Sequence, residues 1–133
     1  MRHKRLFGML AVFAALQTSN AMGEEVLAEY LTWLDAEDTV NSSGTKLTSF
    51  GAILAQDRAN YHRFGIRQEL DTSDPIFSDR NMRSKLPQLY QAGRSVEKYI
   101  RDDVMSGRGH YVYVRIMGKN GRVTHVDVYE GAG

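Results

Sequence analysis

The chain of 133 residues contains no cysteine. This absence excludes a disulfide framework, lipid attachment through a cysteine and a thiolate nucleophile. A small domain without disulfides must be stabilised by an ordinary hydrophobic core. Long apolar runs are absent as well. The run from Leu6 to Leu16 is too short for a membrane-spanning helix, which needs roughly 20 residues. We therefore expect no integral membrane segment in the processed protein.

The first 21 residues have the order of a secretory signal peptide. Basic side chains within residues 2–5 precede the apolar run, and Ser19 and Ala21 supply small side chains at a cleavage site. We expect residues 1–21 to be removed, leaving residues 22–133 as a single small globular domain. The absence of cysteine favours a bacterial periplasm, so we expect a periplasmic or secreted protein. The alternative is an uncut N-terminal anchor.

Acidic residues outnumber basic ones in the predicted processed chain. All sixteen Asp and Glu residues lie beyond position 21, together with fourteen of the seventeen Lys and Arg residues. This balance does not favour nucleic-acid binding, and we expect no nucleic-acid partner. Six of the acids fall between Glu24 and Asp38, where no basic residue occurs. We interpret them as a solvated face packed near a basic face of the same molecule, the alternative being a partner-binding patch.

Apolar spacing predicts helices over residues 24–37, 49–64 and 85–105, the last in two pieces divided at Gly93. Residues 65–83 show little periodicity and are predicted to be an irregular segment. Long irregular segments are uncommon in compact domains and are often functional. This segment is therefore a candidate for mobility or binding.

The C-terminal region predicts a β-hairpin. Residues 110–117 and 122–129 alternate between apolar and polar side chains, and the Asn120-Gly121 pair between them is typical of a tight turn. A face of three branched apolar residues (Val112, Val114 and Ile116) is expected to pack on the helices. A third strand is expected near Val40 or Lys46-Leu47. The predicted fold class is α+β, with three or four helices packed on a small antiparallel sheet that contains the hairpin.

Asp57 lies in the middle of the apolar stripe of the predicted helix 49–64. A buried carboxylate is costly unless it is paired and hydrogen-bonded. We favour a structural role, in which Asp57 pairs with an arginine or a loop backbone and fixes the irregular segment. The alternative is a catalytic acid–base pair of Asp57 and His62. Five residues of separation place the two about 140° apart around a helix, which weakens that hypothesis.

Other catalytic or metal-binding patterns are weak. His110 and His125 could act with Asp127, and His125 shares a strand face with Asp127. Two ligands are too few for a metal site, and the spacing resembles no zinc or calcium motif. The chain also lacks a Gly-x-Ser-x-Gly nucleophile elbow and a phosphate-binding loop. We expect no metal and no cofactor.

The second face of the hairpin carries the candidate binding residues. These are Tyr111, Tyr113, Arg115, His125, Asp127 and Tyr129. They are typical of exposed cross-strand pairs, but they also form a surface that a partner could contact. Our first hypothesis is a non-enzymatic exported module that binds another protein or a cell-envelope component. The alternatives are a small hydrolase with an Asp/His pair and a structural envelope protein. The sequence predicts neither the partner nor the oligomeric state.

Overall fold

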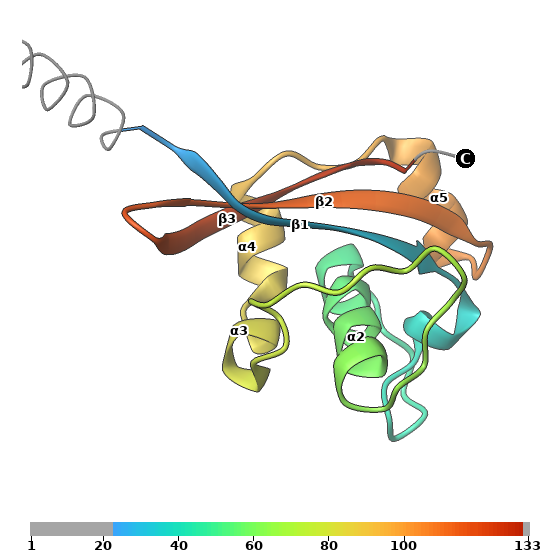
Figure 1. Ribbon diagram of the computed structural model, residues 1–133. Coiled ribbons are helices and arrows are strands. Elements are labelled where there is room, and N and C mark those ends of the chain that lie inside the picture. Colours follow the sequence, from blue (N-terminus) through green and yellow to red (C-terminus); the bar gives the residue numbers. More distant parts are fainter. Residues whose placement is uncertain (1–22, 132–133) are drawn as a thin grey trace, which may run out of the picture.

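The protein has an α+β fold, with helices packed on a three-stranded antiparallel sheet (Figure 1). A computed structural model describes residues 23–131, and the predicted signal peptide lies outside them. The strands are β1 (Glu25–Leu34), β2 (His110–Lys119) and β3 (Arg122–Glu130), in the spatial order β1-β2-β3. The helices are α2 (Phe50–His62), α3 (Arg80–Ser84), α4 (Leu86–Ala92) and α5 (Lys98–Met105), with a 3-10 turn, η3, at Ala36–Thr39. These elements confirm the predicted fold class. Within residues 23–131, every helix is too short or too polar to cross a bilayer.

The prediction of a helix over residues 24–37 was wrong, because this region forms β1. Burial alternates along the strand: Tyr30, Thr32 and Leu34 are at most 2% exposed, whereas Leu31 and Trp33 lie on the other face. Antiparallel pairing with β2 provides the backbone hydrogen bonds that a helix would otherwise make internally. The third strand is therefore β1, and the region predicted for it contributes only a bridge between Val40 and Lys46.

The other helix predictions were confirmed in outline. The first turn of α2 is capped by Ser49, whose side chain accepts a hydrogen bond of 3.2 Å from the backbone N–H of Ala52. The break at Gly93 separates α4 from α5. The predicted irregular segment is irregular up to Asp79, after which α3 begins.

The hairpin was predicted correctly. Asn120 and Gly121 have φ values of 51° and 76°, the left-handed pair that a two-residue type I′ turn requires. The expected apolar face of β2 is fully buried, as are Val126 and Val128 on β3. Together with apolar side chains from α2, α4 and α5, they form the core. Figure 1 shows α2, α3 and α4 together on this side of the sheet.

Both outer edges of the sheet are paired with irregular chain. On the β1 side, the N–H of Thr72 donates to the carbonyl of Leu31 over 2.9 Å. On the β3 side, the N–H of Val128 donates to the carbonyl of Arg94, also over 2.9 Å. Exposed strand edges promote pairing with other chains, and these contacts protect them. The contacts cover the edge of β1 at Leu31 and the edge of β3 at Val128.

Candidate functional site

The sheet face that points away from the core is partly exposed over all three strands. We call it the open face and define it by ten residues: Glu29, Leu31, Trp33, Tyr111, Tyr113, Arg115, Met117, His125, Asp127 and Tyr129. The strand register arranges them in rows, in which Trp33 lies opposite Tyr111, and Leu31, Tyr113 and Tyr129 lie side by side. All ten are half-buried or exposed. The six binding candidates predicted from the hairpin thus share one surface, to which β1 adds residues that the sequence prediction had missed.

Aromatic rings form the centre of the open face. The ring centroids of Trp33 and Tyr111 are 4.7 Å apart, and those of Tyr113 and Tyr129 are 6.2 Å apart. The indole of Trp33 lies directly on the backbone of Gly109, where a Cβ atom would come within 1.9 Å of the ring. Only glycine permits this approach, so the ring is held in place before any partner arrives.

Charged groups lie beside the rings and are paired with one another. The Nε atom of Arg115 is 3.4 Å from a carboxylate oxygen of Glu29, and its guanidinium is 5.7 Å from the centroids of both Tyr113 and Tyr129. Hydrogen bonding to Tyr113 raises the pKa of Arg115. Arg115 is therefore a permanent cation within the aromatic strip.

The structure brings His125 and Asp127 together, as the sequence predicted. The Nε2 atom of His125 is 3.6 Å from Asp127 Oδ1 and 3.2 Å from Glu24 Oε1. The same oxygen of Asp127 accepts a hydrogen bond of 2.8 Å from the N–H of Arg94. Asp127 thereby anchors the segment that protects the edge of β3, which is a structural task.

His110 lies at the opposite end of the hairpin from His125. It is paired with Leu34 across the sheet, whereas His125 is paired with Met117 near the turn. Its Nε2 atom is 2.8 Å from Asp103 Oδ2 on α5. The two histidines therefore do not share a site. Among residues 23–131, no three His, Asp or Glu side chains are grouped closely enough to hold a metal ion.

Asp57 lies in a closed network of polar groups under the sheet. Its Oδ1 atom accepts a hydrogen bond of 2.7 Å from Thr32 Oγ1, and its Oδ2 atom one of 3.0 Å from Arg58 Nε. Burial raises the pKa of Asp57 to about 6, although Arg58 and Thr32 act in the opposite direction. The Arg58 guanidinium is fully buried between the rings of Tyr30 and Tyr61, 3.9 and 4.6 Å from their centroids.

The structure does not bring together Asp57 and His62, the alternative acid–base pair, because His62 contacts Asp74 instead. The Nε2 atom of His62 and the Nη1 atom of Arg58 lie 2.9 and 3.1 Å from Asp74 Oδ1. The other oxygen of Asp74 accepts hydrogen bonds from the N–H groups of Ile76 and Phe77. This carboxylate therefore joins the irregular segment to α2. Asp57 contributes to the same connection, because its partner Arg58 also donates to the carbonyl of Thr72 in that segment. The sequence showed Asp74 only as part of a turn and gave no sign of its partners.

The open face and the Asp57 network thus differ in kind. The open face presents rings and charges to solvent, whereas Asp57 is only 4% exposed and fully engaged with its own chain. No family model matches the chain, and a search of curated proteins and of solved structures finds no match either.

Proposed function

We propose that this protein is an exported, non-enzymatic module that binds another protein through the open face. One observation carries the proposal: four aromatic rings (Trp33, Tyr111, Tyr113 and Tyr129) lie on the partly exposed side of the sheet, with Arg115 among them. Trp, Tyr and Arg are the residues most enriched at the energetic centres of protein interfaces. The signal-like residues 1–21 support a periplasmic or secreted location.

The composition of the open face differs from that of an ordinary solvated sheet. An antiparallel sheet with one face in water usually carries polar side chains there. Here Leu31, Trp33 and Met117 accompany the tyrosines. The rings are also fixed by cross-strand contacts and by the close approach of Trp33 to Gly109. Rings that are already ordered lose little conformational entropy when a partner binds.

Charges around the open face indicate the chemistry of the partner. Acidic side chains predominate: Glu24 contacts His125, Glu29 contacts Arg115, and Glu69 and Glu130 line hollows beside Trp33 and Tyr111. Basic side chains are present as well: Arg115 lies among the rings, and the guanidinium of Arg94 lies 4.4 Å from the ring centroid of Tyr129. Complementary charge steers association and sets specificity. The partner we propose has exposed apolar groups surrounded by basic residues.

The alternative functions make different demands on the structure. A hydrolase needs a carboxylate that a substrate can reach, whereas Asp57 and Asp74 accept hydrogen bonds from buried groups of the same chain. This arrangement supports the structural role of Asp57 that we favoured. A purely structural envelope protein, the other alternative, predicts that no single surface substitution has a phenotype.

The test is a pull-down from envelope extract with the tagged protein as bait, followed by mass spectrometry and titration of the purified candidate. The double substitution Tyr111→Ser and Tyr113→Ser is expected to weaken binding at least tenfold without changing the far-ultraviolet circular dichroism. Phe64→Ser, which changes an aromatic residue 45% exposed outside the open face, is the matched control. Added salt is expected to weaken binding further. A partner that binds the double variant as tightly as the native protein would refute the proposal, as would the absence of any partner.

A further inference from the structure

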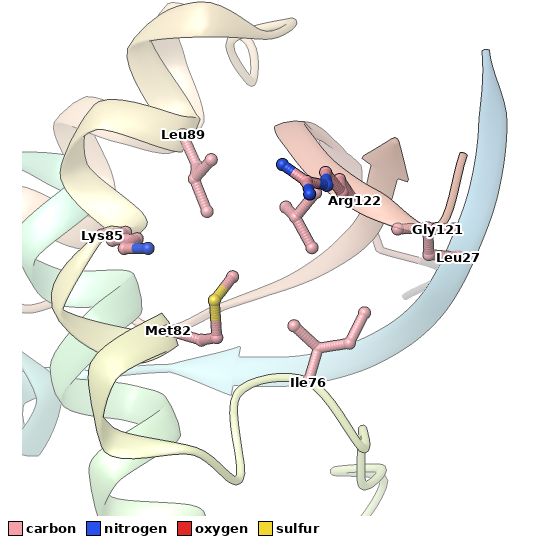
Figure 2. Close-up of a pocket in the computed structure, with 8 residues that line it drawn as sticks. Leu27, Ile76, Met82, Lys85, Leu89, Gly121 and Arg122 are labelled. Carbon is pink, nitrogen blue, oxygen red and sulfur yellow. The ribbon is translucent and has the colours of Figure 1, made fainter. Parts of the chain in front are cut away.

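A second surface feature, a groove, lies between the hairpin turn and the helices α3 and α4 (Figure 2). Its volume is about 560 Å³, within the range of small-molecule sites. The lining residues come from the sheet, from the helices and from the irregular segment: Leu27, Ile76, Met82, Lys85, Leu89, Gly121, Arg122 and Val123. The groove is separate from the open face, because its lining residues include none of the ten that define that face.

The interior of the groove is apolar. Figure 2 shows the side chains of Ile76, Met82 and Leu89 directed into one space from the irregular segment, α3 and α4. Ile76, Met82 and Val123 also pack on the core, so this surface is a continuation of it. Methionine is flexible and adapts to irregular apolar shapes. Such walls fit a flexible hydrocarbon chain.

Two cations lie at the rim of the groove. Lys85 immediately precedes α4 and Arg122 begins β3, so they stand on opposite walls, and both are exposed. Within residues 23–131, neither side chain lies within 4.0 Å of a carboxylate oxygen. The carboxylate of Glu25 instead accepts a hydrogen bond of 3.1 Å from the N–H of Gly121 in the hairpin turn. The two positive charges are thus available to an anion.

We propose that this groove binds a single acyl chain, with its anionic headgroup held between Lys85 and Arg122. The apolar walls accommodate the hydrocarbon, and the charge complementarity at the rim requires a negative end group, either a carboxylate or a phosphate. Two sources have this chemistry, a free fatty acid and a lysophospholipid. The proposal is independent of the open face, and a protein that fails to bind a protein partner could still bind the lipid.

The test is a fluorescence titration of the purified protein with 11-(dansylamino)undecanoic acid, below the concentration at which the probe forms micelles. We expect saturable binding with enhanced dansyl emission. The double variant Lys85→Gln and Arg122→Gln is expected to bind at least tenfold more weakly. The double variant Lys46→Gln and Arg63→Gln, which removes two exposed cations elsewhere, is expected to bind within twofold of the native protein. Tyr111→Ser with Tyr113→Ser should also leave the affinity unchanged.

Competition identifies the source of the ligand and tests the role of the headgroup. Displacement by palmitate but not by lysophosphatidylglycerol would assign a fatty acid, and the reverse would assign a lysophospholipid. Hexadecanol, which has the chain without the charge, is expected to compete at least tenfold less well than the better anion. The proposal would be overturned by a lack of saturable binding, by equal competition from hexadecanol, or by unchanged affinity after substitution of Lys85 and Arg122.

Discussion

Arg58 shows how one side chain can connect several parts of this fold. Its Nε atom binds Asp57, and its Nη1 atom binds both Asp74 and the carbonyl of Thr72. It is fully buried, and both carboxylates are at most 4% exposed. Buried charges are tolerated only when they are paired, so the three residues depend on one another.

Replacing Arg58 by Met tests this dependence. Methionine keeps an unbranched apolar chain but leaves Asp57 and Asp74 without their shared cation. We expect the free energy of unfolding to fall by about 3–5 kcal/mol at neutral pH, measured by urea denaturation. Arg63→Met removes an exposed arginine that follows the same helix, and a change within about 0.5 kcal/mol is expected. Similar losses for the two variants would contradict the role of Arg58.

The raised pKa of Asp38 leads us to expect that stability depends on pH. Burial, followed by the negative charge of Asp57, raises the pKa of Asp38 from 3.8 to about 8. The folded state therefore holds a proton that the unfolded state releases at a lower pH, so this group lowers stability as pH rises from about 4 to 8. Asp38→Asn removes this titration and can still accept the hydrogen bond from the N–H of Asp35.

We compare the free energies of unfolding of Asp38→Asn and of the native protein by urea denaturation at pH 5 and at pH 8.5. Relative to the native protein, we expect the variant to be more stable at pH 8.5 than at pH 5. Asp35→Asn is the control: it removes a less buried carboxylate at the start of the same 3-10 turn. A difference between Asp38→Asn and the native protein that does not vary with pH would show that Asp38 is ionised throughout this range.

At the scale of the elements, β1 shows why a strand was mistaken for a helix. Leu27 and Leu31 completed the helical stripe in the sequence, together with Val26, Tyr30 and Leu34. In the structure Leu27 lines the groove and Leu31 lies on the open face, both outside the closed core. Apolar residues at surface sites disturb the alternation by which a strand is recognised. The hairpin was predictable because its Asn-Gly turn is a local signal that does not depend on distant pairing.

The contact between Trp33 and Gly109 gives a prediction about the β1–β2 pair. A methyl group at position 109 would overlap the indole, so Gly109→Ala must displace Trp33 toward solvent. Trp33 is the only tryptophan in the chain, and its fluorescence therefore reports on the surroundings of this one ring. We expect a red shift of the emission maximum and weaker binding of the protein partner.

The matched variant is Gly121→Ala at the other end of the hairpin. It strains a position with φ of 76° and should lower stability by about 1 kcal/mol or more, but it leaves Trp33 in place. An unshifted emission maximum in Gly109→Ala, or an equal shift in Gly121→Ala, would contradict the proposed packing.

At the scale of the whole molecule, the features that the sequence predicted are local, and those it missed depend on pairing between distant parts of the chain. The hairpin half of the open face was predicted because alternate residues of one strand share a face. The β1 half, including Trp33, depends on pairing between residues about 80 apart in the chain, which no local pattern encodes. Asp74 was missed for the same reason, since its contacts with Arg58 and His62 arise only in the folded chain.

The predicted signal peptide gives a test that concerns the whole chain. Cleavage after Ala21 predicts that the protein recovered from a bacterial periplasm begins at Met22, which intact-mass measurement would show. The peptidase reads small side chains at its site, so Ala21→Arg should leave the precursor uncut. Ala28→Arg, which introduces the same charge within the domain, should leave processing unaffected. Recovery of the native chain at its full mass would favour the alternative of an uncut anchor.

Asp74 connects the irregular segment to the rest of the molecule, and its removal should open that segment without unfolding the core. Asp74→Asn loses the charge that faces Arg58 and His62 and keeps only one good acceptor for the N–H groups of Ile76 and Phe77. Regions with few other buried contacts open locally. We therefore expect trypsin to cut after the exposed Arg67 at least tenfold faster than in the native protein.

Asp79→Asn is the matched control for this experiment. Asp79 caps α3 by accepting a hydrogen bond of 3.0 Å from the N–H of Met82, and within residues 23–131 its side chain makes no ion pair with Arg58 or His62. Equal proteolysis of the two variants would mean that Asp74 does not hold the segment. If Asp74→Asn alone is cut faster, Thr72 should also be released from the edge of β1, and Glu69 from its place beside Trp33. Opening of the segment would then alter partner binding at the open face. The face would lose the negative charge of Glu69 beside it, and the edge of β1 would lose its backbone partner.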